Sequence, residues 1–178
     1  DGSLKWKKSL NCYPDSLTED GTLIATRGDQ VLSISSQGFV NWKFKANGNV
    51  GSSAIGSDGT VYIGSKDSNL YALNGKTGEV KWQFSSGQGS TGQGWISARP
   101  SIGTDGTIYV GAAVVDYLFA INPKKGEVNW KYYTGQDVSN SAIGNDGTIY
   151  VVSEDFKIHA INKTDGSAKW EFATGNKI

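Results

Sequence analysis

The chain has 178 residues, a length that suits a single domain with a sizeable hydrophobic core. Its 17 basic residues balance its 17 acidic ones without any block of like charge, which argues against nucleic-acid binding and a membrane-surface role. The only cysteine, Cys12, excludes an internal disulfide and a multi-cysteine metal site, and no apolar run is long enough for a membrane-spanning helix.

High glycine content, only three prolines and many aromatic residues favour an all-β chain of short strands and frequent turns. The sequence holds no methionine, so we expect a processed protein or a piece of a longer one. The first predicted element is a strand over residues 2–8, in which Gly2 stands four residues ahead of Trp6.

Four longer units follow within what we predict to be one domain over residues 1–178. Each unit ends on the same Gly-x-x-x-Trp spacing, and their approximate bounds are 13–45, 51–85, 96–134 and 138–174. A period of about 40 residues is typical of stacked or radial repeat architectures. The glycines are Gly38, Gly78, Gly126 and Gly166, and the tryptophans are Trp42, Trp82, Trp130 and Trp170.

Each unit contains four short β-runs separated by turn residues. An Asp-Gly-Thr sequence lies between the first two runs, and its Asp precedes the unit's tryptophan by 22 to 25 residues. Asp and Gly tolerate the positive φ of a type I′ turn, so this sequence predicts a tight hairpin. Four antiparallel strands per unit are typical of a β-propeller blade.

The strand patterns assign a place to each run within a blade. Residues 70–73 are apolar at every position, which indicates a strand covered on both faces by neighbouring blades. In the last run, Val80, Trp82 and Phe84 alternate with polar residues, which indicates an outer strand with one wet face. The glycine four residues before each tryptophan supplies the turn into this strand. We therefore predict that each tryptophan of the repeat packs against the backbone of the adjacent blade.

Residues 72–82, ALNGKTGEVKW, carry the pattern Ala-x-Asn-x-x-Thr-Gly-x-x-x-Trp. It returns at 120–130 and 160–170 with Lys125 and Asp165 in place of Thr, and in shortened form at 33–42. This pattern resembles the tryptophan-docking motif of the pyrroloquinoline-quinone (PQQ) repeat family, over nearly the whole chain. The resemblance implies a β-propeller, and it favours a bacterial or archaeal protein that is exported to the periplasm, the cell surface or the medium.

The same resemblance leaves the chemistry open, because the family includes quinoprotein dehydrogenases and non-enzymatic relatives. The dehydrogenases usually close with eight blades, and many carry adjacent cysteines beside PQQ and its calcium ion. This chain has about half the blades and one cysteine, and it shows no nucleophile, P-loop or zinc motif. We therefore predict a protein that is not an enzyme and binds no cofactor or metal, with PQQ and calcium only under the dehydrogenase alternative.

The predicted strands do not add up to a closed ring. Residues 2–8 match an outer strand, yet the last unit already has its own, so five outer strands stand against four sets of inner ones. The sequence predicts four four-stranded blades plus this leading strand, as a partial arc of a larger propeller. A small four-bladed ring and a ring completed by a second chain are the alternatives.

Two candidate binding residues lie in or beside the longest connection, residues 85–100, which is rich in Gly, Ser and Gln. Trp95 can stack on a sugar or on a partner's side chain, because insertions in repeat proteins commonly sit on the binding face. The alternative is that Trp95 folds back over the edge of the blade. Arg99 is predicted in an innermost strand, where it binds an anion or pairs with a nearby Asp.

Other polar and aromatic residues receive mainly structural interpretations. Tyr117 and one of the pair Tyr132-Tyr133, taken as Tyr133, are expected to add exposed aromatic surface. His159 occupies the position of Tyr71 and Phe119 in sister units, so we expect it in aromatic core without partners for catalysis or metal binding. The Asp-Gly-Thr carboxylates lack the spacing of a calcium loop and are explained by their turns.

Together these features predict a non-catalytic binding or scaffold module that recognises another protein through a propeller loop face, including the insertion around Trp95. Self-association through open sheet edges is a related expectation. A carbohydrate-binding surface module and a fragment of a quinoprotein dehydrogenase are the alternatives.

Overall fold

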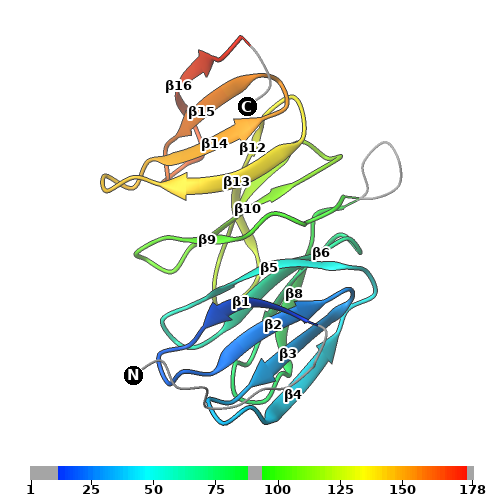
Figure 1. Cartoon of the computed structure of the whole chain (residues 1–178). Helices are drawn as coiled ribbons and strands as arrows, with labels where there is room; N and C mark the ends of the chain where they lie inside the picture. The colour runs from blue at the N-terminus through cyan, green and yellow to red at the C-terminus, as the bar shows by residue number, and fades with distance from the viewer. Residues whose placement is uncertain (1–11, 88–93, 176–178) are drawn as a thin grey trace.

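The computed structural model describes residues 12–87 and 94–175 of the chain. These residues form sixteen β-strands in four antiparallel four-stranded sheets, and none of them is helical (Figure 1). The prediction of an all-β propeller with four four-stranded blades is confirmed. The predicted leading strand over residues 2–8, with Gly2 and Trp6, lies outside the described residues.

The strands of each sheet follow one another in chain order, from the innermost to the outermost. The first sheet is β1 (Tyr13–Leu17), β2 (Leu23–Arg27), β3 (Gln30–Ile34) and β4 (Val40–Lys45). The second is β5 (Val50–Ile55), β6 (Val61–Ser65), β7 (Asn69–Leu73) and β8 (Val80–Ser85). The third is β9 (Ser101–Ile102), β10 (Ile108–Ala112), β11 (Tyr117–Ile121) and β12 (Val128–Tyr133), and the fourth is β13 (Val138–Ile143), β14 (Ile149–Ser153), β15 (Lys157–Ile161) and β16 (Ala168–Ala173).

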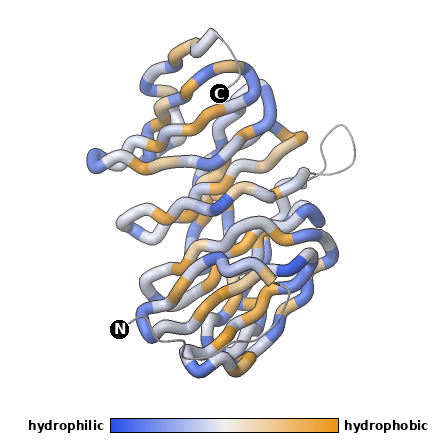
Figure 2. The backbone as a smooth tube through the Cα atoms, in the orientation of Figure 1, coloured by the Kyte–Doolittle hydropathy of each residue, from blue (hydrophilic) through white to orange (hydrophobic). Residues whose placement is uncertain are grey.

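Most of the hydrophobic core lies between adjacent sheets, and a smaller cluster around Ala25, Leu32 and Ile34 belongs to the first sheet alone. Each pair of adjacent sheets encloses a cluster of buried side chains, as Tyr109 and Leu118 do with Ile149 and Val151 between the third and fourth sheets. Apolar stretches follow the strands, and hydrophilic ones gather at the turns (Figure 2). The middle strands are buried on both faces, as their uninterrupted apolar runs predict.

The first and fourth sheets lie at opposite ends of the molecule, with the other two between them (Figure 1). The innermost strands connect neighbours: β5 contacts β1 and β2, and β13 contacts β9 and β10. The described residues therefore form an open arc, and this excludes the small four-bladed ring.

The Asp-Gly turns form hairpins, although their type differs from the prediction. In the second sheet Gly56 N donates to Thr60 O (2.8 Å) and Gly59 N donates to Gly56 O (2.9 Å). Only the glycine has a positive φ, 78° at Gly59, whereas Asp58 does not. The type I′ prediction is wrong because the Asp side chain instead accepts a hydrogen bond from Thr60 N (3.0 Å), which holds a longer turn.

The outer strands differ from the predicted alternation at their first residue. Trp42 and Trp130 are buried, but Val80 and Val128 are exposed by 45% and 41%. A register shift explains this, because Trp82 pairs with Ala72 while Val80 pairs with the next residue, Leu73. The bulge turns the valine away from the buried face.

Candidate functional site

Three tryptophans join adjacent sheets by the same geometry. The Nε1–H groups of Trp42, Trp82 and Trp130 donate to the carbonyls of Gly75, Pro123 and Lys163, at 2.8, 2.8 and 2.9 Å. Each acceptor stands three residues before the next sheet's turn glycine. These tryptophans therefore bridge consecutive sheets through a ring contact and a hydrogen bond.

The turn glycines lie beneath the rings. Gly78, Gly126 and Gly166 have φ of 76°, 71° and 74°, and a Cβ added to any of them would lie 2.7 Å from the indole of the preceding sheet. Gly38, in the first sheet, is buried with φ of 84°. Trp170, at the other end of the arc, is 47% exposed.

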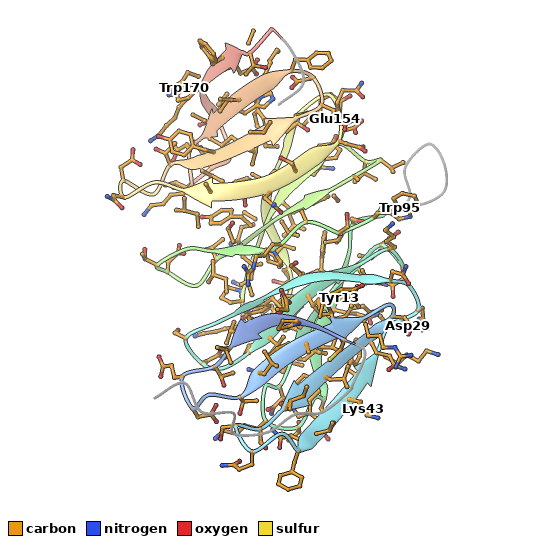
Figure 3. All side chains as sticks on the ribbon, viewed as in Figure 1. Tyr13, Asp29, Lys43, Trp95, Glu154 and Trp170 are labelled. Carbon is orange, nitrogen blue, oxygen red and sulfur yellow. The ribbon has the colours of Figure 1, made fainter. Side chains whose placement is uncertain are left out.

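One loop face of the arc carries the connections between sheets and the turns between the second and third strands of each sheet. Trp95 lies on this face (Figure 3). Lys66 Nζ, from the second sheet, is 4.9 Å from the centroid of the Trp95 ring. Trp95 O accepts a hydrogen bond from Ala113 N (2.8 Å), at the turn between β10 and β11. The half-buried indole is therefore tied to the blade edge under a lysine, a placement nearer to the folded-back alternative than to a free loop.

A second aromatic group lies at this end of the third sheet. The rings of Tyr117 and Tyr133 are 5.3 Å apart, and Lys131 Nζ is 4.4 Å from the centroid of the Tyr117 ring. Tyr133 is 58% exposed, whereas Tyr117 is half-buried against Phe119. Tyr132 points the other way, toward the fourth sheet.

Backbone strain is also concentrated at this end, and no sequence motif indicated it. Ser68, Val114, Asp116 and Phe156 have positive φ, the last three in turns of the third and fourth sheets. Val114 is β-branched, and such residues rarely adopt its φ of 71°. Val114 N donates to Asp137 Oδ1 (2.7 Å), while burial and then the nearby Asp137 raise the pKa of Asp116.

Arg99 lies just before the two-residue strand β9, not within a longer innermost strand as predicted. Its Nε donates to Ser53 O (2.9 Å), and its Nη2 lies 4.0 Å from Asp15 Oδ1. Its backbone N–H donates to Asn140 Oδ1 (3.0 Å). Arg99 thus links the innermost segments of all four sheets, and the carboxylate beside its guanidinium is that of Asp15.

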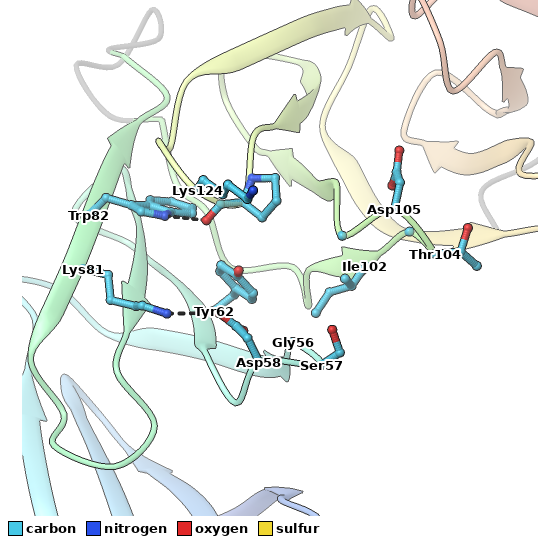
Figure 4. Close-up of a pocket in the computed structure, with 13 residues that line it drawn as sticks. Gly56, Ser57, Asp58, Tyr62, Lys81, Trp82, Ile102, Thr104, Asp105 and Lys124 are labelled. Atoms are coloured by element: carbon cyan, nitrogen blue, oxygen red, sulfur yellow. Dashed lines mark hydrogen bonds and ion pairs between the residues drawn. The ribbon is translucent and has the colours of Figure 1, made fainter.

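The opposite loop face carries the Asp-Gly turns and three grooves between adjacent sheets. Their volumes are about 780 Å³ between the first and second sheets, 610 Å³ between the second and third, and 370 Å³ between the third and fourth. Ile102 lines all three. In the groove of Figure 4, Lys81 Nζ is 3.0 Å from Asp58 Oδ2. Burial tends to raise the pKa of Asp58, but hydrogen bonds from Thr60 and Lys81 lower it to about 2. The sequence did not indicate these grooves, because they arise only where two sheets meet.

His159 is buried, but its surroundings differ from the predicted aromatic core. Its Nε2 is 3.3 Å from Asp155 Oδ1 and its Nδ1 is 3.2 Å from the hydroxyl of Tyr132. That hydroxyl donates to Glu171 Oε1 (2.9 Å), and burial followed by this bond raises the pKa of Tyr132 to about 12. His159 therefore belongs to a polar network that joins β12 to the fourth sheet. The sequence did not indicate this network, because Tyr132 and His159 are far apart along the chain.

Over residues 12–87 and 94–175, no three His, Cys, Asp or Glu side chains come together as a metal site would need. Cys12, the only cysteine, packs beside the buried Ala25, Leu32 and Ile34. In the same described ranges no helix is long and apolar enough to cross a membrane.

The family model described as outer membrane protein assembly factor BamB matches residues 1–103 and 86–177. A search of curated proteins gave no match. Among solved structures, the chain is similar to BamB from Moraxella catarrhalis, with 19% identity and a TM-score of 0.74 over 94% of this chain and 49% of that one.

Two further structures share the fold. A quinohemoprotein alcohol dehydrogenase from Pseudomonas putida HK5 has 17% identity and a TM-score of 0.76, over 92% of this chain and 35% of that one. A protein of unknown function from Bacteroides caccae has 15% identity and a TM-score of 0.64, over 92% and 61%. The chain thus spans between about a third and three fifths of the length of these structures.

Proposed function

Since this chain belongs to the PQQ-like repeat family whose model is described as the assembly factor BamB, we propose that it is a non-catalytic module that recognises another protein. The recognition surface is the loop face that carries Trp95, Tyr117 and Tyr133. We further propose that the module acts in an exported compartment and without a bound cofactor.

The single observation that carries the proposal is the pairing of aromatic rings with lysines at this end. Lys66 lies over Trp95 and Lys131 lies over Tyr117, at 4.9 and 4.4 Å from the ring centroids. Phe156 and Tyr133 add exposed aromatic area, at 47% and 58%. Aromatic residues are enriched in protein interfaces, where they dominate the binding energy.

The test is photo-cross-linking in the native host, with benzoylphenylalanine at position 133. The matched control places the same probe at Phe39, an exposed aromatic residue in a turn on the opposite loop face. We expect a reproducible adduct with one protein from position 133 only, and a loss of that adduct when Trp95→Ala is added. Equal adducts from both positions, or none from position 133, would contradict the proposal.

A further inference from the structure

The contact between the third and fourth sheets differs from its two counterparts at one position of the repeat. At each contact a ring of an outer strand packs against a ring of the next sheet's third strand. The pairs are Phe44–Tyr71, Phe84–Phe119 and Tyr132–His159, with centroids 5.0, 5.0 and 5.5 Å apart. In the described part of the chain, only the last pair also places the polar atoms of both rings within hydrogen-bond distance. His159 is the single histidine of the sequence, so this contact alone contains a group that titrates near neutral pH.

The His159 ring lies among two carboxylates, one hydroxyl and one ammonium group. It is 2% exposed, with Nε2 at 3.3 Å from Asp155 Oδ1 and Nδ1 at 3.6 Å from Glu171 Oε1. Lys157 Nζ is 2.8 Å from Glu171 Oε2 and 3.8 Å from Asp155 Oδ2. A neutral imidazole therefore leaves this group of side chains with one uncompensated negative charge, which an imidazolium would balance.

The hydrogen bonds also favour a second proton on the ring. A neutral imidazole that donates from Nε2 to Asp155 has an acceptor at Nδ1. The single hydroxyl proton of Tyr132 then has two acceptors, His159 Nδ1 at 3.2 Å and Glu171 Oε1 at 2.9 Å, and it can satisfy only one of them. In the imidazolium, Nδ1–H donates to the Tyr132 oxygen, and the hydroxyl is free to donate to Glu171.

We propose that Tyr132, Asp155, His159 and Glu171 form a pH-sensitive latch that holds the fourth sheet against the third when the imidazole is protonated. Burial by itself opposes a charged ring, but the two carboxylates and the additional hydrogen bond to Tyr132 offset that cost. The protonated ring makes one more hydrogen bond across the contact than the neutral ring. The latch therefore stabilises the contact in mildly acidic solution, and this stabilisation is lost as the pH rises through the range in which histidine titrates.

The second sheet supplies the design of a matched control. There the hydroxyl of Tyr71 donates to Asp67 Oδ2 (2.6 Å), four residues earlier, and Phe44 of the first sheet packs on the ring. The double variant Tyr132→Phe/His159→Tyr reproduces this arrangement at the contact between the third and fourth sheets. It keeps two packed rings and an acceptor at Asp155 but contains no histidine.

The test compares urea unfolding of the unmodified chain and the double variant at pH 8.5 and pH 5.5. Between these two pH values, we expect the unfolding constant of the unmodified chain to fall about tenfold relative to that of the variant, the factor expected for one hydrogen bond to a charged group. Glu171→Gln removes the carboxylate that competes for the hydroxyl proton, so it should abolish most of this effect while His159 is retained. The same pH dependence in the unmodified chain and the double variant would overturn the proposal.

Nitrogen NMR of the unmodified chain tests the protonation of the ring without any substitution. The signals of the single imidazole are unambiguous and distinguish a neutral ring from an imidazolium. At pH 7 we expect mainly imidazolium in the folded chain and mainly neutral imidazole in the same chain unfolded in urea, because a solvated histidine has lost most of its proton at this pH. A folded ring that is no more protonated than the unfolded one would overturn the proposal, even if the double variant failed to fold.

Discussion

Trp130 and Trp170 have the same place in the repeat but different surroundings. Each packs against a tyrosine of its own sheet at nearly the same distance, 5.7 and 5.8 Å. Trp130 is 9% exposed and Trp170 is 47% exposed, because only Trp130 has a following sheet within the described residues. The motif therefore sets the orientation of the ring, while the neighbouring sheet provides most of its burial and its hydrogen bond.

The largest expected effect comes from removing the two rings. Trp130→Ala should lower the free energy of unfolding by about 3–5 kcal/mol, because it opens a cavity between two sheets. Trp170→Ala should cost less than about 1 kcal/mol, because its ring is half exposed already. Urea denaturation of both variants measures the difference, and equal losses would contradict the comparison.

The turn glycine tests the other half of the contact. Gly166→Ala should cost about 2–3 kcal/mol, because φ is 74° and the new Cβ would lie 2.7 Å from the Trp130 ring. Gly59→Ala is the control, because Gly59 has φ of 78° and open space around its Cβ position. Its cost should stay near 1 kcal/mol, from backbone strain alone. Similar unfolding midpoints for the two variants would argue against the ring contact.

The hydrogen bond can be separated from the ring by substitution with phenylalanine. Trp130→Phe keeps an aromatic ring but leaves the carbonyl of Lys163 without its donor, so we expect a loss of about 1–2 kcal/mol. Trp170→Phe should change the free energy of unfolding by no more than about 0.5 kcal/mol. Thermal or urea unfolding of the two variants measures the difference. Equal losses of unfolding free energy in both would count against the hydrogen bond.

The smallest effect should be the same in an inner and a terminal sheet. Asp58 binds Thr60 and Lys81, and Asp146 binds Thr148 and Lys169 in the same way, with both pKa values lowered to about 2. A folded pKa below the unfolded value, about 3.9, stabilises the fold above pH 4, and the contribution is lost as the pH falls toward 2. Solvent screens these exposed pairs, so the contribution is small.

The measurement is the unfolding midpoint between pH 6 and pH 2. Asp58→Asn and Asp146→Asn should each reduce the slope of stability against pH by a similar amount. The reason is that each Asp finds its Thr and Lys partners within its own blade, so a neighbouring sheet is not involved. A clear difference between the two variants would mean that neighbouring sheets influence this turn as well.

The sequence determined the features that depend on near neighbours along the chain. Alternation and uninterrupted apolar runs place each strand in its sheet, and Asp-Gly and Gly-x-x-x-Trp place the turns, because backbone sterics and side-chain direction act over a few residues. The bulge that exposes Val80 and Val128 was missed because it changes the register without changing the pattern of residue types.

Tertiary structure alone decided what distant segments do together. Arg99 contacts Ser53 and Asp15 across the innermost strands, and His159 contacts Tyr132 of the neighbouring sheet. No pattern of spacing along the sequence predicts these contacts. The grooves around Ile102 and the exposure of Trp170 have the same origin. They depend on which sheet lies next to which, and burial is a property of that packing rather than of the motif.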